Sequence, residues 1–251
     1  MEDLKALLDL EVKKRDSSLE ISYDNPDPLL IASREKDEYI SLICALFAYG
    51  NAKQIVKFLD RLDFSLLNES EDIIKKELKG FYYRFQKEID ISEFFITIKR
   101  LKEIDSLENL FYQGYKKENS IIDGLNSLIT TIISQNSFKS HGYNFLIGSP
   151  PTLKSKSTYK RYNIYLRWMV RDDKLDLALW KSVNRADLLM PLDTHTFKIS
   201  KQIGLLNRKS YDLKSVIELT QKLKEFDEND PIKYDFALYR IGQEKILDDF
   251  K

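Results

Sequence analysis

Glycine and proline are scarce in this chain, and their scarcity narrows the fold more than any other feature of the sequence. Among 251 residues there are 8 Gly and 6 Pro, so the sequence signals few tight turns. The alternation of apolar and polar residues that marks β-strands is also rare. Apolar residues instead recur at helical spacing, which predicts an all-α fold. A chain of this length suits a single domain made of two closely packed lobes.

Several segments carry clear start or stop signals for helices. Residues 35–47 are apolar nearly all round and predict a buried central helix, which Gly50 and Asn51 break before a second helix begins. Residues 29–32 are expected to be extended or to form a short turn. Residues 137–156 are expected to be rich in loops because they contain two consecutive prolines and many polar residues.

The stretch 149–206 contains the residues that are the strongest candidates for chemistry. Ser157 is the predicted N-cap of a basic amphipathic helix, with Lys160 in its first turn. Arg167 and Arg171 follow Lys160 at spacings of seven and four, which predicts one shared basic face. Asp193 is the predicted N-cap of the next helix.

Charge is distributed unevenly along a chain whose net charge is zero. Residues 126–171 hold seven basic side chains and no acid, so the rest of the chain carries a balancing negative charge. Residues 194–211 repeat the pattern on a smaller scale. A neutral protein with one basic face is what a phosphate-binding surface requires. A solvated helix face is the simpler alternative. The basic residues of the longer stretch are Lys139, Lys154, Lys156, Lys160, Arg161, Arg167 and Arg171.

Cysteine and histidine are too few for a structural metal site. The chain has one cysteine, Cys44, within an apolar run, and two histidines. These cannot build a closed zinc site or a four-cysteine cluster, so we expect no metal and no cofactor. Cys44 is expected to be a buried thiol in a reducing compartment. The charged N-terminus and the lack of a long apolar run predict a cytoplasmic protein that does not enter a membrane. We expect a monomer, although the sequence itself does not reveal the oligomeric state.

Two segments resemble a known family. Asp193-Thr-His-Thr-Phe followed by a basic helix resembles the Val-Asp-Thr-His segment of helix-hairpin-helix base-excision DNA glycosylases. Lys160, 33 residues earlier, is the best match for the lysine of the bifunctional members, at a spacing similar to the archaeal 8-oxoguanine branch. ICALFAYGNAKQIVKFLDRL resembles the helix–loop–helix segment in which an Asn-rich loop enters the duplex. The whole chain also resembles an uncharacterised bacterial family that shares RWMVR, PLDTH and KYDFAL.

The resemblance implies a two-lobed helix-hairpin-helix fold, with lobe one over residues 35–135 and lobe two over 1–34 plus 136–251. It implies a DNA repair enzyme that excises an oxidised purine, 8-oxoguanine above others, and then cleaves the strand as an AP lyase. Its partner would be double-stranded DNA containing a damaged base, which must be flipped out of the stack. Asp193 would be the catalytic carboxylate and Lys160 the nucleophile that forms a Schiff base. The implied DNA contacts are Asn51, Lys154, Lys156, Arg161, Arg167, His195 and Lys198.

Simpler interpretations stand beside these. The usual Leu-Pro-Gly-Val-Gly signature before the lysine is absent, so Lys154 and Lys156 remain alternatives as the nucleophile. Asp193 is otherwise only an N-cap, and Lys160 only a solvated lysine. Tyr234 and Asp235, after an Asp-Pro pair that predicts the last helix, either line the pocket or cap that helix. Trp168 and Trp180 are expected in the core. The rival functions are a monofunctional glycosylase for alkylated bases, a non-enzymatic DNA-binding module and a helical adaptor.

Overall fold

The chain is helical throughout the part that the structure describes. The computed structural model describes residues 2–17 and 20–243. Within these two ranges it has thirteen α-helices, three short 3-10 helices and no β-strand, with one isolated bridge between Tyr83 and Gln86. The prediction of an all-α fold is therefore confirmed.

Backbone contacts divide the chain into two compact units. The first unit combines Met1–Asn25 with Thr152–Lys251, and the second unit is the continuous segment Pro26–Pro151. The first unit contains α1 (Glu2–Arg15), α10 (Lys160–Val170), η2 (Arg185–Asp187), α11 (Thr194–Gln202), α12 (Leu213–Lys224), η3 (Pro231–Tyr234) and α13 (Asp235–Gln243). The second contains α2 (Leu29–Glu35), α3 (Glu38–Leu46), α4 (Ala52–Leu59), η1 (Phe64–Asn68), α5 (Glu71–Glu77), α6 (Glu88–Lys102), α7 (Leu107–Tyr115), α8 (Ile121–Ser134) and α9 (His141–Ile147).

The second unit has α3 in its core. All residues from 41 to 46 are buried, and Cys44 is among them, as predicted. The prediction of one helix over 35–47 is wrong at its start. Lys36 takes a left-handed backbone conformation, with φ of 48°, and ends α2. Asp37 then caps a new helix, because its side chain accepts hydrogen bonds from two backbone N–H groups of the first turn.

Two segments that were expected to lack helices form them. Residues 29–32 begin α2, and residues 141–147 form α9 inside the stretch that was expected to be rich in loops. Ser140 caps α9 by accepting a hydrogen bond from the Tyr143 backbone N–H at 2.9 Å. Gly142 lets α9 approach α6 closely, since a Cβ at this position would lie 2.8 Å from the Asp90 Cγ. Tertiary packing of this kind stabilises helices too short to persist alone.

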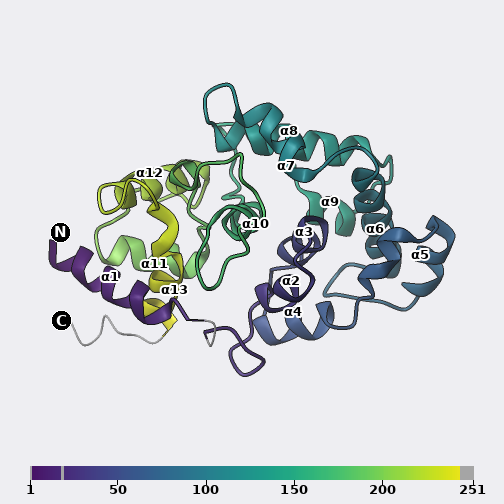
Figure 1. Cartoon of the computed structure of the whole chain (residues 1–251), viewed down its shortest axis with the longest axis horizontal. Helices are drawn as coiled ribbons and strands as arrows, with labels where there is room; N and C mark the ends of the chain where they lie inside the picture. The colour runs from purple at the N-terminus through teal and green to yellow at the C-terminus, as the bar shows by residue number, and fades with distance from the viewer. Residues whose placement is uncertain (1, 18–19, 244–251) are drawn as a thin grey trace. The chain divides into compact units, whose positions relative to one another are not determined.

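The core of the first unit is built around α10. Trp168 is fully buried and Trp180 is 2 % exposed, so both tryptophans belong to the core, as predicted. In Figure 1, α1 at the purple end of the chain lies beside the yellow α13, and the two helices are in contact. Helix α11 also packs on α13. Gly242 makes this approach possible, because a Cβ there would stand 2.7 Å from the Ile199 Cγ1.

Candidate functional site

Lys160 is the first residue of α10. The predicted cap, Ser157, does not cap this helix. Its hydroxyl instead accepts a hydrogen bond from the Tyr159 backbone N–H at 3.1 Å. Tyr159 occupies the N-cap position with a left-handed φ of 51° and no side-chain capping bond. The helix therefore begins three residues beyond Ser157 and places the Lys160 side chain at its N-terminus.

Asp193 is the N-cap of α11, as predicted. Its Oδ1 accepts a hydrogen bond from the Thr196 backbone N–H at 2.7 Å. This bond uses one carboxylate oxygen and leaves Oδ2 to face another partner. The helix ends at Gln202, and Gly204 follows with a φ of 77°, the left-handed conformation that suits a helix C-terminus.

The structure brings Lys160 and Asp193 together. The Lys160 Nζ lies 3.5 Å from the Asp193 Oδ2, although 33 residues separate the two in sequence. The Lys160 side chain is 34 % exposed and the Asp193 side chain 15 % exposed, so a ligand can reach the amine from solvent. Both residues stand at helix N-termini, whose free N–H groups and dipoles favour anions such as phosphate.

A second carboxylate lies within electrostatic reach of this pair. Asp235, the first residue of α13, is buried. Burial raises the pKa of Asp235, the Arg167 guanidinium opposes this rise, and the charge of Asp193 adds to it. The positive charge of Lys160 also lowers the pKa of Asp235. The charges of Lys160 and Asp193 are therefore coupled to the buried ion pair between Arg167 and Asp235.

The prediction that Arg167 contacts DNA does not fit its position. Arg167 is 4 % exposed, and its Nε lies 3.2 Å from the Asp176 Oδ1. Its Nη1 contacts the Asp235 carboxylate, and the guanidinium lies 4.6 Å from the centre of the Phe236 ring. The prediction of a basic face fails because α10 is buried on nearly all sides, so the spacing of seven residues directs Arg167 into the protein and not towards solvent.

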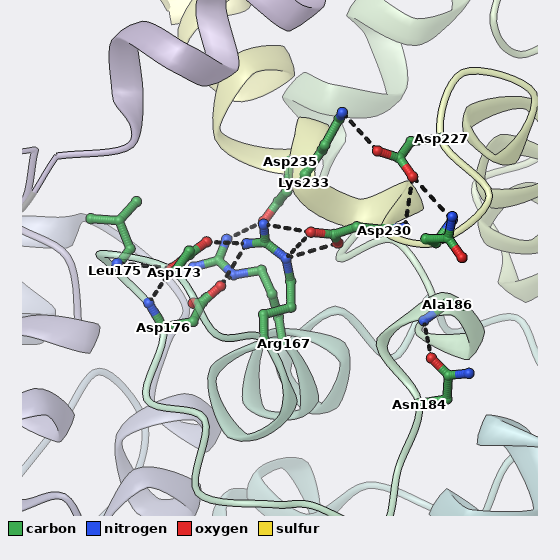
Figure 2. A network of polar contacts seen from close by, with 12 residues as sticks. Arg167, Asp173, Leu175, Asp176, Asn184, Ala186, Asp227, Asp230, Lys233 and Asp235 are labelled. Carbon is green, nitrogen blue, oxygen red and sulfur yellow. Dashed lines mark hydrogen bonds and ion pairs between the residues drawn. The ribbon is translucent and has the colours of Figure 1, made fainter.

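Arg171 joins the same network, of which Figure 2 shows Arg167 and the acids Asp173, Asp176, Asp230 and Asp235 at close range. Its guanidinium lies 2.6 Å from Asp173, 2.7 Å from Asp176 and 2.9 Å from Asp230. Asp230 belongs to the Asp-Pro pair that predicts the start of the last helix, with the aspartate as its N-cap. The side chain of Asp230 makes no capping bond, although the proline after it lies in the first turn of η3. Buried charges require such pairing.

The remaining basic residues predicted in this unit are at the surface. Lys154 and Lys156 are exposed in the loop before α10, and His195 and Lys198 are exposed on α11. Arg161 is half-buried. These side chains and the two helix N-termini belong to the same compact unit.

Asn51 belongs to the second unit, where it is exposed and caps α4. Its Oδ1 accepts a hydrogen bond from the Gln54 backbone N–H at 3.3 Å. Gly50 before it has a φ of 102°, and a Cβ at this position would meet the Arg84 Nη1 at 2.8 Å. The turn therefore needs glycine, and it presents Asn51 at the surface.

Sequence reasoning missed two residues that support the pair. Asp176 was not singled out, because nothing in its local sequence distinguishes a buried acid from a surface one. Tyr211 was not singled out either, although its hydroxyl donates a hydrogen bond to the Leu192 carbonyl, directly before Asp193. No local pattern points to either residue, because both contacts form only in the folded chain.

The chain belongs to the family described as protein of unknown function (DUF2400), whose model matches residues 27–244. No curated protein and no solved structure matched the chain. Among residues 2–17 and 20–243, no group of three or more His, Cys, Asp or Glu side chains is arranged to hold a metal ion. In the same described ranges, no helix has both the length and the apolar character that a membrane crossing needs.

Proposed function

We propose that this chain is a DNA glycosylase of the helix-hairpin-helix superfamily with AP lyase activity, and that it excises an oxidised purine, 8-oxoguanine above others. The observation that supports the proposal is the 3.5 Å approach of the Lys160 Nζ to the Asp193 Oδ2. The lysine and the aspartate that the resemblance selects from separate segments are the two that meet. Asp193 also caps a helix, as the catalytic aspartate of that superfamily does.

In the proposed chemistry, Lys160 is the nucleophile and Asp193 is the stabilising carboxylate. A damaged base rotates out of the duplex, because its glycosidic bond is inaccessible inside the stack. The ammonium of Lys160 passes a proton to the departing base, so that Asp193 keeps its negative charge. The neutral amine then bonds to C1′ as the C1′–N bond breaks and its electron pair leaves with the base. The carboxylate of Asp193 stabilises the positive charge that develops on the sugar.

The lyase step follows from the same covalent link. Opening of the sugar ring between C1′ and O4′ gives a protonated Schiff base between Lys160 and C1′. Loss of a proton from C2′ then breaks the C3′–O bond, and the 3′ phosphate leaves with the electron pair. Water hydrolyses the imine and returns Lys160 as an amine. The sequence of steps needs neither a metal nor a redox partner.

The proposed partner is double-stranded DNA that contains a damaged base. Phosphate contacts supply most of the affinity of such complexes. In this unit they fall to the exposed basic side chains and to the N-termini of α10 and α11. Arg167 takes no part, because its guanidinium is buried between acids. The residues proposed to contact DNA are Lys154, Lys156, Arg161, His195 and Lys198, together with Asn51 from the second unit.

A monofunctional glycosylase is the second candidate, and the exposure of Lys160 favours it. A lysine that is 34 % exposed and paired with a carboxylate is suited to hold a phosphate as an ammonium. Asp193 would then activate water, and no covalent adduct would form. A DNA-binding module without activity would use the same surface and release no base.

Borohydride trapping tests the proposal on three duplexes, which contain one 8-oxoguanine, one abasic site or no damage. We expect the wild type to form a covalent adduct on the first two, because reduction fixes the Schiff base. Lys160→Gln should form no adduct. Asp193→Asn should lose base release while it still binds DNA. Lys154→Gln and Lys156→Gln are the matched controls, and each should still be trapped.

The other outcomes separate the alternatives. An adduct that persists in Lys160→Gln and disappears in one of the control variants moves the nucleophile to that lysine. Base release without any adduct identifies the monofunctional glycosylase. Salt-sensitive binding with neither adduct nor base release identifies the binding module. Unchanged base release in Asp193→Asn contradicts the proposed role of the carboxylate in every version.

A further inference from the structure

The hydroxyl of Tyr211 joins the two loops that lead to Lys160 and Asp193. It donates a hydrogen bond to the Leu192 carbonyl at 2.9 Å, one residue before Asp193. It accepts a hydrogen bond from the Thr158 Oγ1 at 3.3 Å, two residues before Lys160. One oxygen atom therefore sits between the chain segments that present the two members of the pair.

Helix α12 is hydrogen-bonded to the same two loops at further points. The Leu213 backbone N–H donates to the Ser155 carbonyl at 3.5 Å, in the loop before α10. The Thr220 Oγ1 accepts from the Met190 backbone N–H at 3.0 Å, in the loop before α11. Each of these bonds holds one loop to α12. Tyr211 differs from them because its hydroxyl bonds to both loops at once.

The ring of Tyr211 also contacts the helix that Asp193 caps. Its centroid lies 5.5 Å from that of Phe197 on α11, with the ring planes at 79°. Burial raises the pKa of Tyr211, the hydrogen bond from Thr158 opposes this rise and the charge of Asp193 adds to it. The phenol therefore stays protonated at neutral pH and remains a donor to the Leu192 carbonyl.

We propose that Tyr211 is a positioning residue whose hydroxyl sets the separation of the Lys160 amine and the Asp193 carboxylate. The proposal rests on the proposed role of that pair. Tyr211 acts through the loops at Thr158 and Leu192, to which its hydroxyl is hydrogen-bonded. Without the bridging oxygen, each loop can shift independently of the other. A misplacement of about 1 Å at a reacting group lowers rates by about 100-fold.

Zero-length crosslinking measures the separation without any reference to activity. A carbodiimide activates a carboxylate and joins it to a nearby amine as an amide, with loss of a urea. In the wild type we expect a Lys160–Asp193 crosslink in the peptide mass spectrum. The Lys233–Asp227 ion pair, at 2.8 Å in the same unit, supplies an internal reference. The reagent must act on the folded protein without DNA.

Tyr211→Phe removes the hydroxyl and keeps the ring. We expect the yield of the Lys160–Asp193 crosslink to fall several-fold relative to the reference pair. Tyr39→Phe is the control, because it also deletes a phenol that donates to a backbone carbonyl, that of Asp105 at 2.8 Å, but in the second unit. Thr158→Val removes the donor on one side of the bridge and should lower the yield in the same direction.

The activity measurement is read separately. Single-turnover trapping on the abasic duplex should slow by about 10- to 100-fold in Tyr211→Phe with unchanged DNA affinity, and should not change in Tyr39→Phe. An unchanged crosslink yield in folded Tyr211→Phe overturns the positioning role, whatever the trapping rate. A wild type that gives the crosslink but no trapping rejects the proposed lyase, and the crosslink ratio still decides the role of Tyr211.

Discussion

Replacing Arg167 by methionine would remove the guanidinium that two buried carboxylates share. Methionine keeps an unbranched, flexible side chain that can fill much of the space of the arginine stem. The Arg167 side chain is 5 % exposed, that of Asp176 is 1 % exposed and that of Asp235 is 12 % exposed. Removing one partner of a buried ion pair costs about 3–5 kcal/mol, because the remaining charge stays desolvated. We expect a loss of this size at pH 7.

Arg208→Met supplies the matched control within the same unit. Arg208 pairs with Asp212 at 2.8 Å, but the two side chains are 32 % and 21 % exposed. Ion pairs at the surface contribute about 0–1 kcal/mol. The same chemical change should therefore have a much smaller effect at this position.

Tryptophan fluorescence in a urea titration is the suitable assay. Trp168 and Trp180 are the two tryptophans of the chain, and both lie in the first unit, so the signal reports on that unit. With a slope of about 2 kcal/mol per molar urea, Arg167→Met should lower the midpoint by about 1.5–2.5 M. Arg208→Met should lower it by less than about 0.5 M.

The pH dependence sharpens the test. The positive charge of Arg167 lowers the pKa of Asp176 and of Asp235. In Arg167→Met both carboxyls hold their protons to higher pH, and at pH 5 the neutral forms no longer need a partner. The difference from wild type should therefore be smaller at pH 5 than at pH 7. Equal effects of the two arginine substitutions, or a difference that does not vary with pH, would refute the reasoning.

Two further predictions concern single sites. Burial raises the pKa of Asp176 to about 6, so between about pH 4 and pH 6 the folded state holds a proton that the unfolded state has released. As pH rises through this range, the free energy of unfolding of the wild type should therefore fall by up to about 3 kcal/mol relative to that of Asp176→Asn. Urea titrations at stepped pH measure this difference, and a difference that stays constant with pH contradicts the raised pKa of Asp176. Gly114→Ala should cost about 3 kcal/mol, because its Cβ would lie 2.6 Å from the Asp123 carbonyl carbon. Gly80→Ala is the control, because Gly80 has a φ of 79° and a Cβ there would meet no atom within 4 Å, so the substitution should cost only about 1 kcal/mol. Thermal unfolding followed by circular dichroism measures both variants. Equal losses of stability in the two variants would show that α7 and α8 can separate to make room for the Cβ.

The helical content was predictable because it depends on local periodicity. The cap at Asp193 and the break at Gly50 were also predictable, because each depends on the chemistry of one or two residues. Helix α9, which Ser140 caps, was not predictable, since its packing depends on Asp90, fifty residues before Ser140 in sequence. Local signals fix the type of an element, and tertiary contacts decide whether a short element forms.

In the candidate site, too, local sequence features were predictable and tertiary contacts were not. Lys160 and Asp193 were selected from motif and helix position, and the structure places them within 3.5 Å of each other. Arg167 was misplaced because a spacing of seven residues fixes a helix face but not the direction in which that face points. The acids that surround it lie in other elements. Tyr211 could not be found, because its role depends on two loops that meet only after folding.

The first unit is built from two separate segments of the chain, and this has a consequence for synthesis on the ribosome. The second unit is continuous and its synthesis is complete before residue 152 is made, whereas α1 must wait for α13, against which it packs. At about 5–20 residues per second, translation of residues 16–234, which separate α1 from α13, takes about 10–45 s. During this interval Leu8, fully buried in the finished protein, is exposed. The nascent chain therefore exposes Leu8 to chaperones during this time, and a run of slow codons after residue 151 would lengthen that exposure.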